Sequence, residues 1–203
     1  DDWLLGYKRE LDEVTTRRLT PLPDTDITDY ISERAVKLRM VLEKKRDGRF
    51  KGRLILQGFR EPSSWDGGPT DSPVASMSSI RSLLYMNGNK GDIISSIDVS
   101  VAFLQSMEYD DKDFKRYVYY KPHSNAKSQY YILRGPIYGQ RVASKKWFDT
   151  LRKHLITEGF VPGEDEPCVY VHPVTKMKVL CWVDDLICRG SVEATDAFYK
   201  SLA

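Results

Sequence analysis

Apolar positions along the chain predict several short strands and a smaller number of helices. Leu4, Tyr7, Leu11 and Val14 recur at helical spacing, so residues 2–18 are expected to form an amphipathic helix. Other apolar runs are short, rich in β-branched and aromatic residues, and bounded by turn residues, which is typical of strands. Strands are expected at residues 36–42, 50–58, 92–98, 117–120, 130–133, 169–172 and 179–188.

Two further helices have recognisable ends. Ser76 or Ser78 can cap a helix that ends at Gly88, and Ser144 can cap one that ends at Gly159. The connections between strands are too short for regular βαβ winding. The sequence therefore predicts an α+β fold.

Two adjacent acids interrupt the apolar run at residues 179–188. Asp184 and Asp185 are expected at the tight turn of a β-hairpin between two buried strands. The two carboxylates repel each other and resist desolvation, and a bound divalent cation relieves both penalties. The alternative is an ordinary solvated turn, because Asp is common at turns.

A third acid, Asp98, stands where another apolar strand ends. Acids from two neighbouring strands are what a two-metal site for phosphoryl transfer requires, with ions about 3.5–4 Å apart. Magnesium takes most of its ligands from water and phosphates, so three carboxylates are sufficient. The pattern predicts two Mg²⁺ ions, with Mn²⁺ as the alternative cation.

Charge is unevenly distributed along the chain. Residues 34–60 hold ten basic and two acidic residues, whereas residues 61–113 hold nine acidic and three basic ones. A basic segment followed by an acidic one fits a protein that binds phosphates with one part and metal ions with another. Solvated edge strands are the alternative explanation for the basic segment.

Other features of the composition exclude several classes of protein. The three cysteines lack the paired spacing of a zinc site and are expected to be reduced core residues, and the three histidines are scattered. No apolar stretch is long enough to span a bilayer, so no membrane partner is expected. The first residue, Asp1, suggests a piece of a longer protein.

Seven motifs, in order, resemble the reverse transcriptase of copia-type LTR retrotransposons. They are Glu10-Leu11 with Leu22-Pro23, Lys44-Lys45-Arg46-Asp47-Gly48, Ser72-Pro73-Val74-Ala75, Asp98-Val99 with Ala102-Phe103-Leu104, Ile137-Tyr138-Gly139, Pro167-Cys168-Val169-Tyr170-Val171, and Val183-Asp184-Asp185. The resemblance implies the fingers and palm of a right-handed polymerase, with an antiparallel sheet, helices packed on one face, and the thumb absent. It implies an N-terminal helix and linker at 1–30, fingers at 31–91, palm at 92–113, a fingers–palm connection at 114–142, and palm at 143–203.

The resemblance also implies the reaction, which is RNA-directed addition of deoxynucleotides to a primer 3′ end. Asp98, Asp184 and Asp185 correspond to the catalytic carboxylates and metal ligands, and the backbone carbonyl of Val99 is a further expected ligand. Asp98 and Asp184 are the preferred direct ligands.

Several residues correspond to the nucleotide pocket. Phe103 stands where the family keeps an aromatic ring under the sugar, which would exclude a 2′-hydroxyl; the alternative is that it packs in the core. Lys51 and Arg53 alternate on one strand and so share a face, as a triphosphate site requires. The remaining pocket residues are Tyr138, Gly139 and Gln140.

Four residues are expected to contact nucleic acid. Arg141, Lys145 and Lys146 are candidate phosphate contacts, with a solvated helix face as the alternative. Trp182 is expected to lie against the primer end, where most relatives have Tyr. Ser144 replaces the proline that usually opens the following helix.

The expected partners are an RNA or DNA template-primer, dNTPs, and the rest of a Pol polyprotein with its thumb and ribonuclease H. The resemblance implies a cytoplasmic location in virus-like particles, or a nuclear one. Two alternatives remain open. One is a truncated fragment that binds nucleic acid without polymerising, and the other is a two-metal nuclease, which would need neither a sugar gate at Phe103 nor a triphosphate site.

Overall fold

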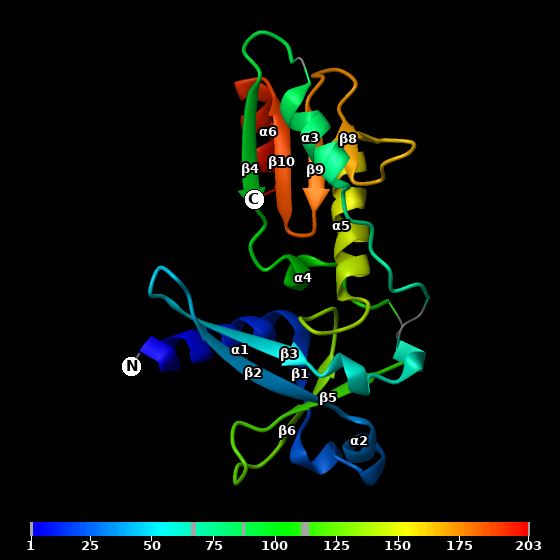
Figure 1. Cartoon of the computed structure of the whole chain (residues 1–203). Helices are drawn as coiled ribbons and strands as arrows, with labels where there is room; N and C mark the ends of the chain where they lie inside the picture. The colour runs from blue at the N-terminus through cyan, green and yellow to red at the C-terminus, as the bar shows by residue number, and fades with distance from the viewer. Residues whose placement is uncertain (1, 66–67, 87, 111–113, 203) are drawn as a thin grey trace. The chain divides into compact units, whose positions relative to one another are not determined.

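Two five-stranded sheets organise the chain in the computed structural model, which describes residues 2–65, 68–86, 88–110 and 114–202 (Figure 1). The first sheet belongs to a unit formed by residues 1–70 and 103–146. The second belongs to a unit formed by residues 71–102 and 147–203. The prediction of an α+β fold is confirmed.

The first unit holds the sheet with strand order β1-β6-β5-β2-β3. Short 3-10 turns follow β1 and β3. The elements are α1 (Asp2–Arg18), β1 (Leu19–Pro21), α2 (Asp29–Arg34), β2 (Val36–Lys44), β3 (Phe50–Leu56), β5 (Arg116–Tyr120) and β6 (Gln129–Leu133), with α4 (Ala102–Gln105) starting at the unit boundary.

One pair of strands in this sheet is parallel. β2 and β5 run in the same direction, with Val36 opposite Val118, so the prediction of a purely antiparallel sheet is wrong here. Parallel neighbours need a long crossover connection. The many residues between these two strands supply it, and the spacing of apolar residues within each strand gives no sign of the pairing.

The open edge of β3 is covered by α1. A Cβ on Gly52 would lie 2.8 Å from the Gly6 carbonyl oxygen, so the helix approaches the strand more closely than any side chain would allow. One Glu10 carboxylate oxygen accepts a hydrogen bond from the Leu54 N–H at 2.8 Å, and burial raises the pKa of Glu10. The helix thus satisfies an edge donor that would otherwise face a partner strand or water.

The second unit holds the sheet with order β4-β10-β9-β8-β7, in which all pairs are antiparallel. Its elements are α3 (Met77–Tyr85), β4 (Ile93–Asp98), α5 (Ala143–Thr157, of which residues 147–157 belong to this unit), β7 (Val161–Pro162), β8 (Val169–Val171), β9 (Lys178–Trp182), β10 (Asp185–Gly190) and α6 (Val192–Ser201).

Helices cover both faces of the second sheet, and the expectation of helices on one face is wrong. Leu83 of α3 packs with Leu180 of β9, whereas Tyr199 of α6 donates a hydrogen bond to Ser95 of β4 at 2.8 Å. Leu180 lies opposite Ile187, which lies opposite Ser96, so Leu180 and Ser96 share a face. Successive side chains of a strand alternate between faces, so Ser95 points to the opposite face. Figure 1 shows α3 in front of the sheet and α6 behind it. Helix α6 lies outside the helices predicted from the sequence.

Helix boundaries differ in detail from the prediction. The Ser76 hydroxyl accepts from the Ser79 N–H at 3.0 Å, so Ser76 is confirmed as a cap, although α3 ends at Tyr85 rather than Gly88. Ser144 lies inside α5 and is not its cap, because the Lys146 N–H already donates to the Val142 carbonyl at 2.9 Å, two residues before Ser144. All three cysteines are free and buried, as expected. Among the described residues, no helix is long and apolar enough to cross a membrane.

We predict that replacing Gly139 by alanine will destabilise the first unit far more than replacing Gly48. Both glycines have φ of 85°, but a Cβ on Gly139 would lie 2.3 Å from the Leu56 carbonyl oxygen, whereas nothing lies within 4 Å of one on Gly48. Gly48→Ala should cost about 1–2 kcal/mol from backbone strain alone. Gly139→Ala should cost at least about 2 kcal/mol more through overpacking, measured by urea unfolding. An equal loss of unfolding free energy in the two variants would contradict the close approach of Gly139 to the Leu56 carbonyl.

Candidate active site

A two-residue turn joins β9 to β10 at the end of the second sheet. Trp182 and Asp185 form the closing pair, so Val183 and Asp184 make the turn. The prediction that both acids lie in the turn is therefore wrong for Asp185, which is the first residue of β10. The buried residues behind the turn, Val179, Leu180, Cys181, Leu186 and Cys188, confirm that both strands are buried.

The turn is strained and is held by two hydrogen bonds. Val183 has φ of 56°, a conformation that β-branched residues rarely adopt. The indole Nε1–H of Trp147 donates to the Val183 carbonyl at 2.7 Å, and the Val99 N–H donates to the Asp184 carbonyl at 2.9 Å. Donors from α5 and from the end of β4 therefore fix both carbonyls of the turn.

Two of the three acids lie side by side. Asp185 is directly opposite Asp98 in the β10–β4 pair and directly opposite Trp182 in the β10–β9 pair. Directly opposite residues of an antiparallel sheet point to the same face. Trp182, Asp185 and Asp98 consequently form a row across three strands, with Asp184 in the adjacent turn.

The three acids interact electrostatically. Partial desolvation raises the pKa of Asp185, and the charges of Asp184 and Asp98 raise it further. Like charges close together disfavour ionisation. A cation bound here would relieve that repulsion.

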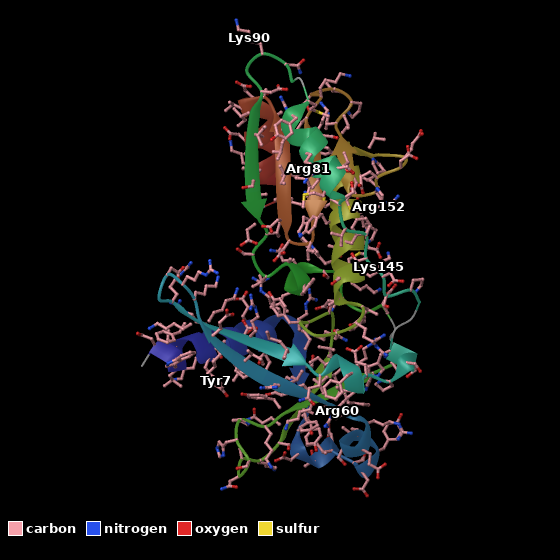
Figure 2. All side chains as sticks on the ribbon, viewed as in Figure 1. Tyr7, Arg60, Arg81, Lys90, Lys145 and Arg152 are labelled. Carbon is pink, nitrogen blue, oxygen red and sulfur yellow. The ribbon has the colours of Figure 1, made fainter. Side chains whose placement is uncertain are left out.

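The donor chemistry at the row fits a hard divalent cation, because the acids offer only oxygen ligands. In the part of the chain that the structure describes, however, no three His, Cys, Asp or Glu side chains already form a metal-ligand group. Val99, whose carbonyl is a predicted ligand, lies directly after β4 and is buried. Lys90 lies before β4, at the other end of the sheet from the turn (Figure 2).

The predicted triphosphate residues lie on β3 in the first unit. Lys51 and Arg53 share one face of the strand, while Gly52, Leu54 and Leu56 are buried on the other. Arg53 Nη1 lies 3.3 Å from a carboxylate oxygen of Glu43, and both side chains are largely exposed. Among the described residues, no carboxylate lies within ion-pair distance of Lys51.

The predicted sugar-contacting residue also lies in the first unit. The Phe103 ring packs edge-on against the Tyr138 ring, with centroids 5.3 Å apart. Phe103 is half-buried, so it is not simply a core residue. The tight approach of Gly139 to Leu56 fixes the segment that carries Tyr138.

Two of the other predicted contacts have structural partners in the first unit. The buried Gln140 side chain accepts hydrogen bonds from the Tyr109 hydroxyl and the Ile137 N–H, both at 3.0 Å. Arg141 donates to the backbone carbonyls of Glu61 and Pro62 at 3.0 and 3.2 Å. Both side chains are thus engaged in holding loops together.

The two lysines predicted to contact nucleic acid lie in the first turn of α5. Lys145 and Lys146 are half-buried, and Lys145 is marked on the helix in Figure 2. Helical spacing predicts Trp147 only as an apolar residue of that helix. A buried indole usually finds an acceptor for its N–H, which is the signal that could have indicated its contact with the turn.

Comparison with known proteins identifies a family. Residues 27–203 match the family model described as "Reverse transcriptase (RNA-dependent DNA polymerase)". The Retrovirus-related Pol polyprotein from transposon RE1 of Arabidopsis thaliana is 32% identical over 183 residues, which are 85% of this chain and 12% of that protein.

Relatives from two other organisms are also retrotransposon Pol polyproteins. The Retrovirus-related Pol polyprotein from transposon TNT 1-94 of Nicotiana tabacum is 25% identical over 78% of this chain and 12% of its own length. The Transposon Ty1-LR2 Gag-Pol polyprotein of Saccharomyces cerevisiae is 26% identical over 92% of this chain and 10% of its own length. The chain thus spans only a small part of these curated relatives.

We predict that Trp147→Phe will loosen the turn. The substitution keeps most of the buried ring but removes the donor to the partly buried Val183 carbonyl, and loss of such a hydrogen bond costs about 0.5–1.5 kcal/mol. Urea unfolding should report that loss, and amide exchange at residues 183–185 should accelerate. Trp182→Phe is the matched control, since Trp182 is 38% exposed and should change stability by less than about 0.5 kcal/mol. Equal effects of the two substitutions on stability and exchange would contradict the role of Trp147 in holding the turn.

Proposed function

Because the chain belongs to the reverse transcriptase (RNA-dependent DNA polymerase) family and resembles Pol polyproteins of copia-type retrotransposons, we propose that it is the nucleotidyl-transfer core of such an enzyme. The proposed reaction adds deoxynucleotides to the 3′ end of a primer paired with an RNA template. The observation that carries the proposal is the side-by-side position of Asp98 and Asp185, next to Asp184, at the end of an apolar sheet.

Asp98, Asp184 and Asp185 would hold the divalent ions that the family uses. When bound, two magnesium ions would supply Lewis-acid activation of the attacking oxygen and charge neutralisation at the phosphates. The raised pKa of Asp185 supports this role, because a cation would offset both the desolvation and the repulsion from Asp184 and Asp98 that raise it. Mn²⁺ accepts the same oxygen ligands.

Lys51 is the better candidate for the triphosphate. Arg53 already has a carboxylate neighbour in Glu43, whereas Lys51 has no ion pair among the described residues. An ammonium group that is held in no ion pair can take a phosphate oxygen without first breaking one. Arg53 would then maintain the positive potential of the strand.

Phe103 would select the sugar. Its ring, braced by Tyr138, would occupy the space that a 2′-hydroxyl needs. The next three residues would hold the backbone beside Tyr138 in place through their contacts in the first unit, rather than by touching phosphate. They are Gly139, Gln140 and Arg141.

The remaining residues would contact nucleic acid. Trp182, which shares a face with Asp185, would lie against the primer end, and Lys145 and Lys146 would contact backbone phosphates.

We assign the first unit to the fingers and the second to the palm. This assignment groups α3, which the sequence analysis included in the fingers, with the sheet that carries the acids. The proposed partners are a template-primer, dNTPs and the other domains of a Pol polyprotein, including a thumb and a ribonuclease H. The proposed locations are virus-like particles in the cytoplasm, or the nucleus.

Primer extension tests the proposal directly. We expect the purified chain to extend a DNA primer on an RNA template with dNTPs and Mg²⁺, and Asp184→Asn to lower the rate at least about a hundredfold. The loss would follow from removing a carboxylate that holds the reacting groups.

Asp196→Asn on α6 is the matched control, because it removes an exposed acid away from the row and should leave the rate unchanged. Extension that persists in Asp184→Asn would contradict the proposed site. A folded chain that binds the duplex without extending the primer would favour nucleic-acid binding alone.

A further inference from the structure

Arg18 is a buried cation at the end of α1, outside the residues that match the family model. It is only 3% exposed, and its Nη2 donates to the Leu104 and Ser106 carbonyls at 2.5 and 2.6 Å. Burial lowers the pKa of Arg18, and the carboxylate of Glu108 lies 3.9 Å from its Nη1. Burying a guanidinium is unfavourable unless acceptors compensate it, and here two backbone carbonyls do so.

The surroundings leave the guanidinium one position. A Cβ on Gly135 would lie 2.4 Å from Arg18 Nη1 and 3.1 Å from its Cζ, so the glycine provides the space that the side chain fills. The end of α1 is fixed as well. The Arg134 N–H donates to the Arg18 carbonyl at 2.8 Å, and Arg134 Nη2 donates to the Thr16 carbonyl at 2.6 Å.

The carbonyls that Arg18 binds belong to the segment that carries Phe103. Leu104 follows Phe103 within α4, and the Ser106 N–H donates to the Phe103 carbonyl at 3.3 Å. The Phe103 ring rests on Tyr138. Arg18 therefore restrains the backbone on one side of Phe103, and Tyr138 restrains the ring itself.

We propose that Arg18 is a positioning residue for sugar selection, which holds the Phe103 segment so that the ring closes the space beside the 2′ carbon of an incoming nucleotide. The proposal rests on the function proposed above. Steric exclusion of one hydroxyl requires that the excluding side chain be held in place. A displacement of about 1 Å is enough to change which nucleotide a site binds. A buried arginine with two backbone acceptors provides that rigidity.

The test compares incorporation of deoxynucleotides and ribonucleotides by variants of the full chain. Arg18→Gln removes the charged donors, and Gly135→Ala displaces the guanidinium without removing it. Arg17→Gln is the matched control, because the neighbouring arginine is exposed and, within the described residues, forms an ion pair with Glu13 alone, on the same helix. Arg18→Lys keeps the charge and should restore part of the function.

We expect Arg18→Gln to lower the ratio of kcat/KM for dTTP to that for UTP about tenfold, mainly by improving use of UTP. Gly135→Ala should shift the ratio in the same direction, and Arg17→Gln should leave it unchanged. Amide exchange in residues 103–109 should accelerate in Arg18→Gln and Gly135→Ala only. If Arg18→Gln fails to fold, Gly135→Ala and Arg18→Lys decide the question.

Two results would overturn the proposal. The first is an equal loss of activity with both nucleotides, which would make Arg18 merely structural. The second is an unchanged ratio despite faster exchange. If the wild-type chain extends no primer, the proposed polymerase function fails instead. The exchange measurement then decides the positioning claim, and unchanged protection in Arg18→Gln would overturn it.

Discussion

The register of β10 against β4 is the constraint on which the rest of the candidate site depends. It sets Asp185 directly opposite Asp98, and like charges in that position destabilise a sheet. The pairing persists because the residues behind the acids are apolar and buried, Leu186 and Cys188 among them. A slip of one residue would turn those side chains toward the opposite face, so burial of the strands fixes the position of the acids.

Strained backbone lies beside the acids on both strands. Val183 precedes Asp184 with φ of 56°, and Val101 follows Asp98 by three residues with φ of 50°. Each such residue costs of order 1–3 kcal/mol and persists only where its surroundings fix it. At Val183 the indole of Trp147 supplies part of that restraint. Of the three non-glycine residues with positive φ in the described part of the chain, two therefore lie beside the acids, and the third, Lys176, lies before β9. Strained backbone beside the acids is typical of functional sites.

Local sequence signals predicted local structure well. Periodicity located α1 and every strand except the short β1 and β7, and the Ser76 cap was recognisable because capping depends on neighbouring residues alone. Parallel pairing of β2 with β5 and the two-sided cover of the second sheet depend on contacts between distant segments, which periodicity does not encode.

At the site, the acids were recognisable because charge within an apolar run is costly. The residue that holds the turn beside the acids and the residue that holds the Phe103 segment were not. Trp147 and Arg18 look like an ordinary helix-core residue and an ordinary surface cation in the sequence, and only the fold brings them to the carbonyls that they bind.

Strand register brings Asp98 beside the adjacent acids Asp184 and Asp185, and together they form one proposed cation site. Isothermal titration of Mn²⁺ into the wild-type chain, Asp98→Asn and Asp196→Asn tests it most directly, because binding can be measured without polymerisation. We expect Asp98→Asn to weaken the binding at least about tenfold and Asp196→Asn to bind as the wild type does. Equal binding by all three would contradict the claim that Asp98 and Asp185 share a site.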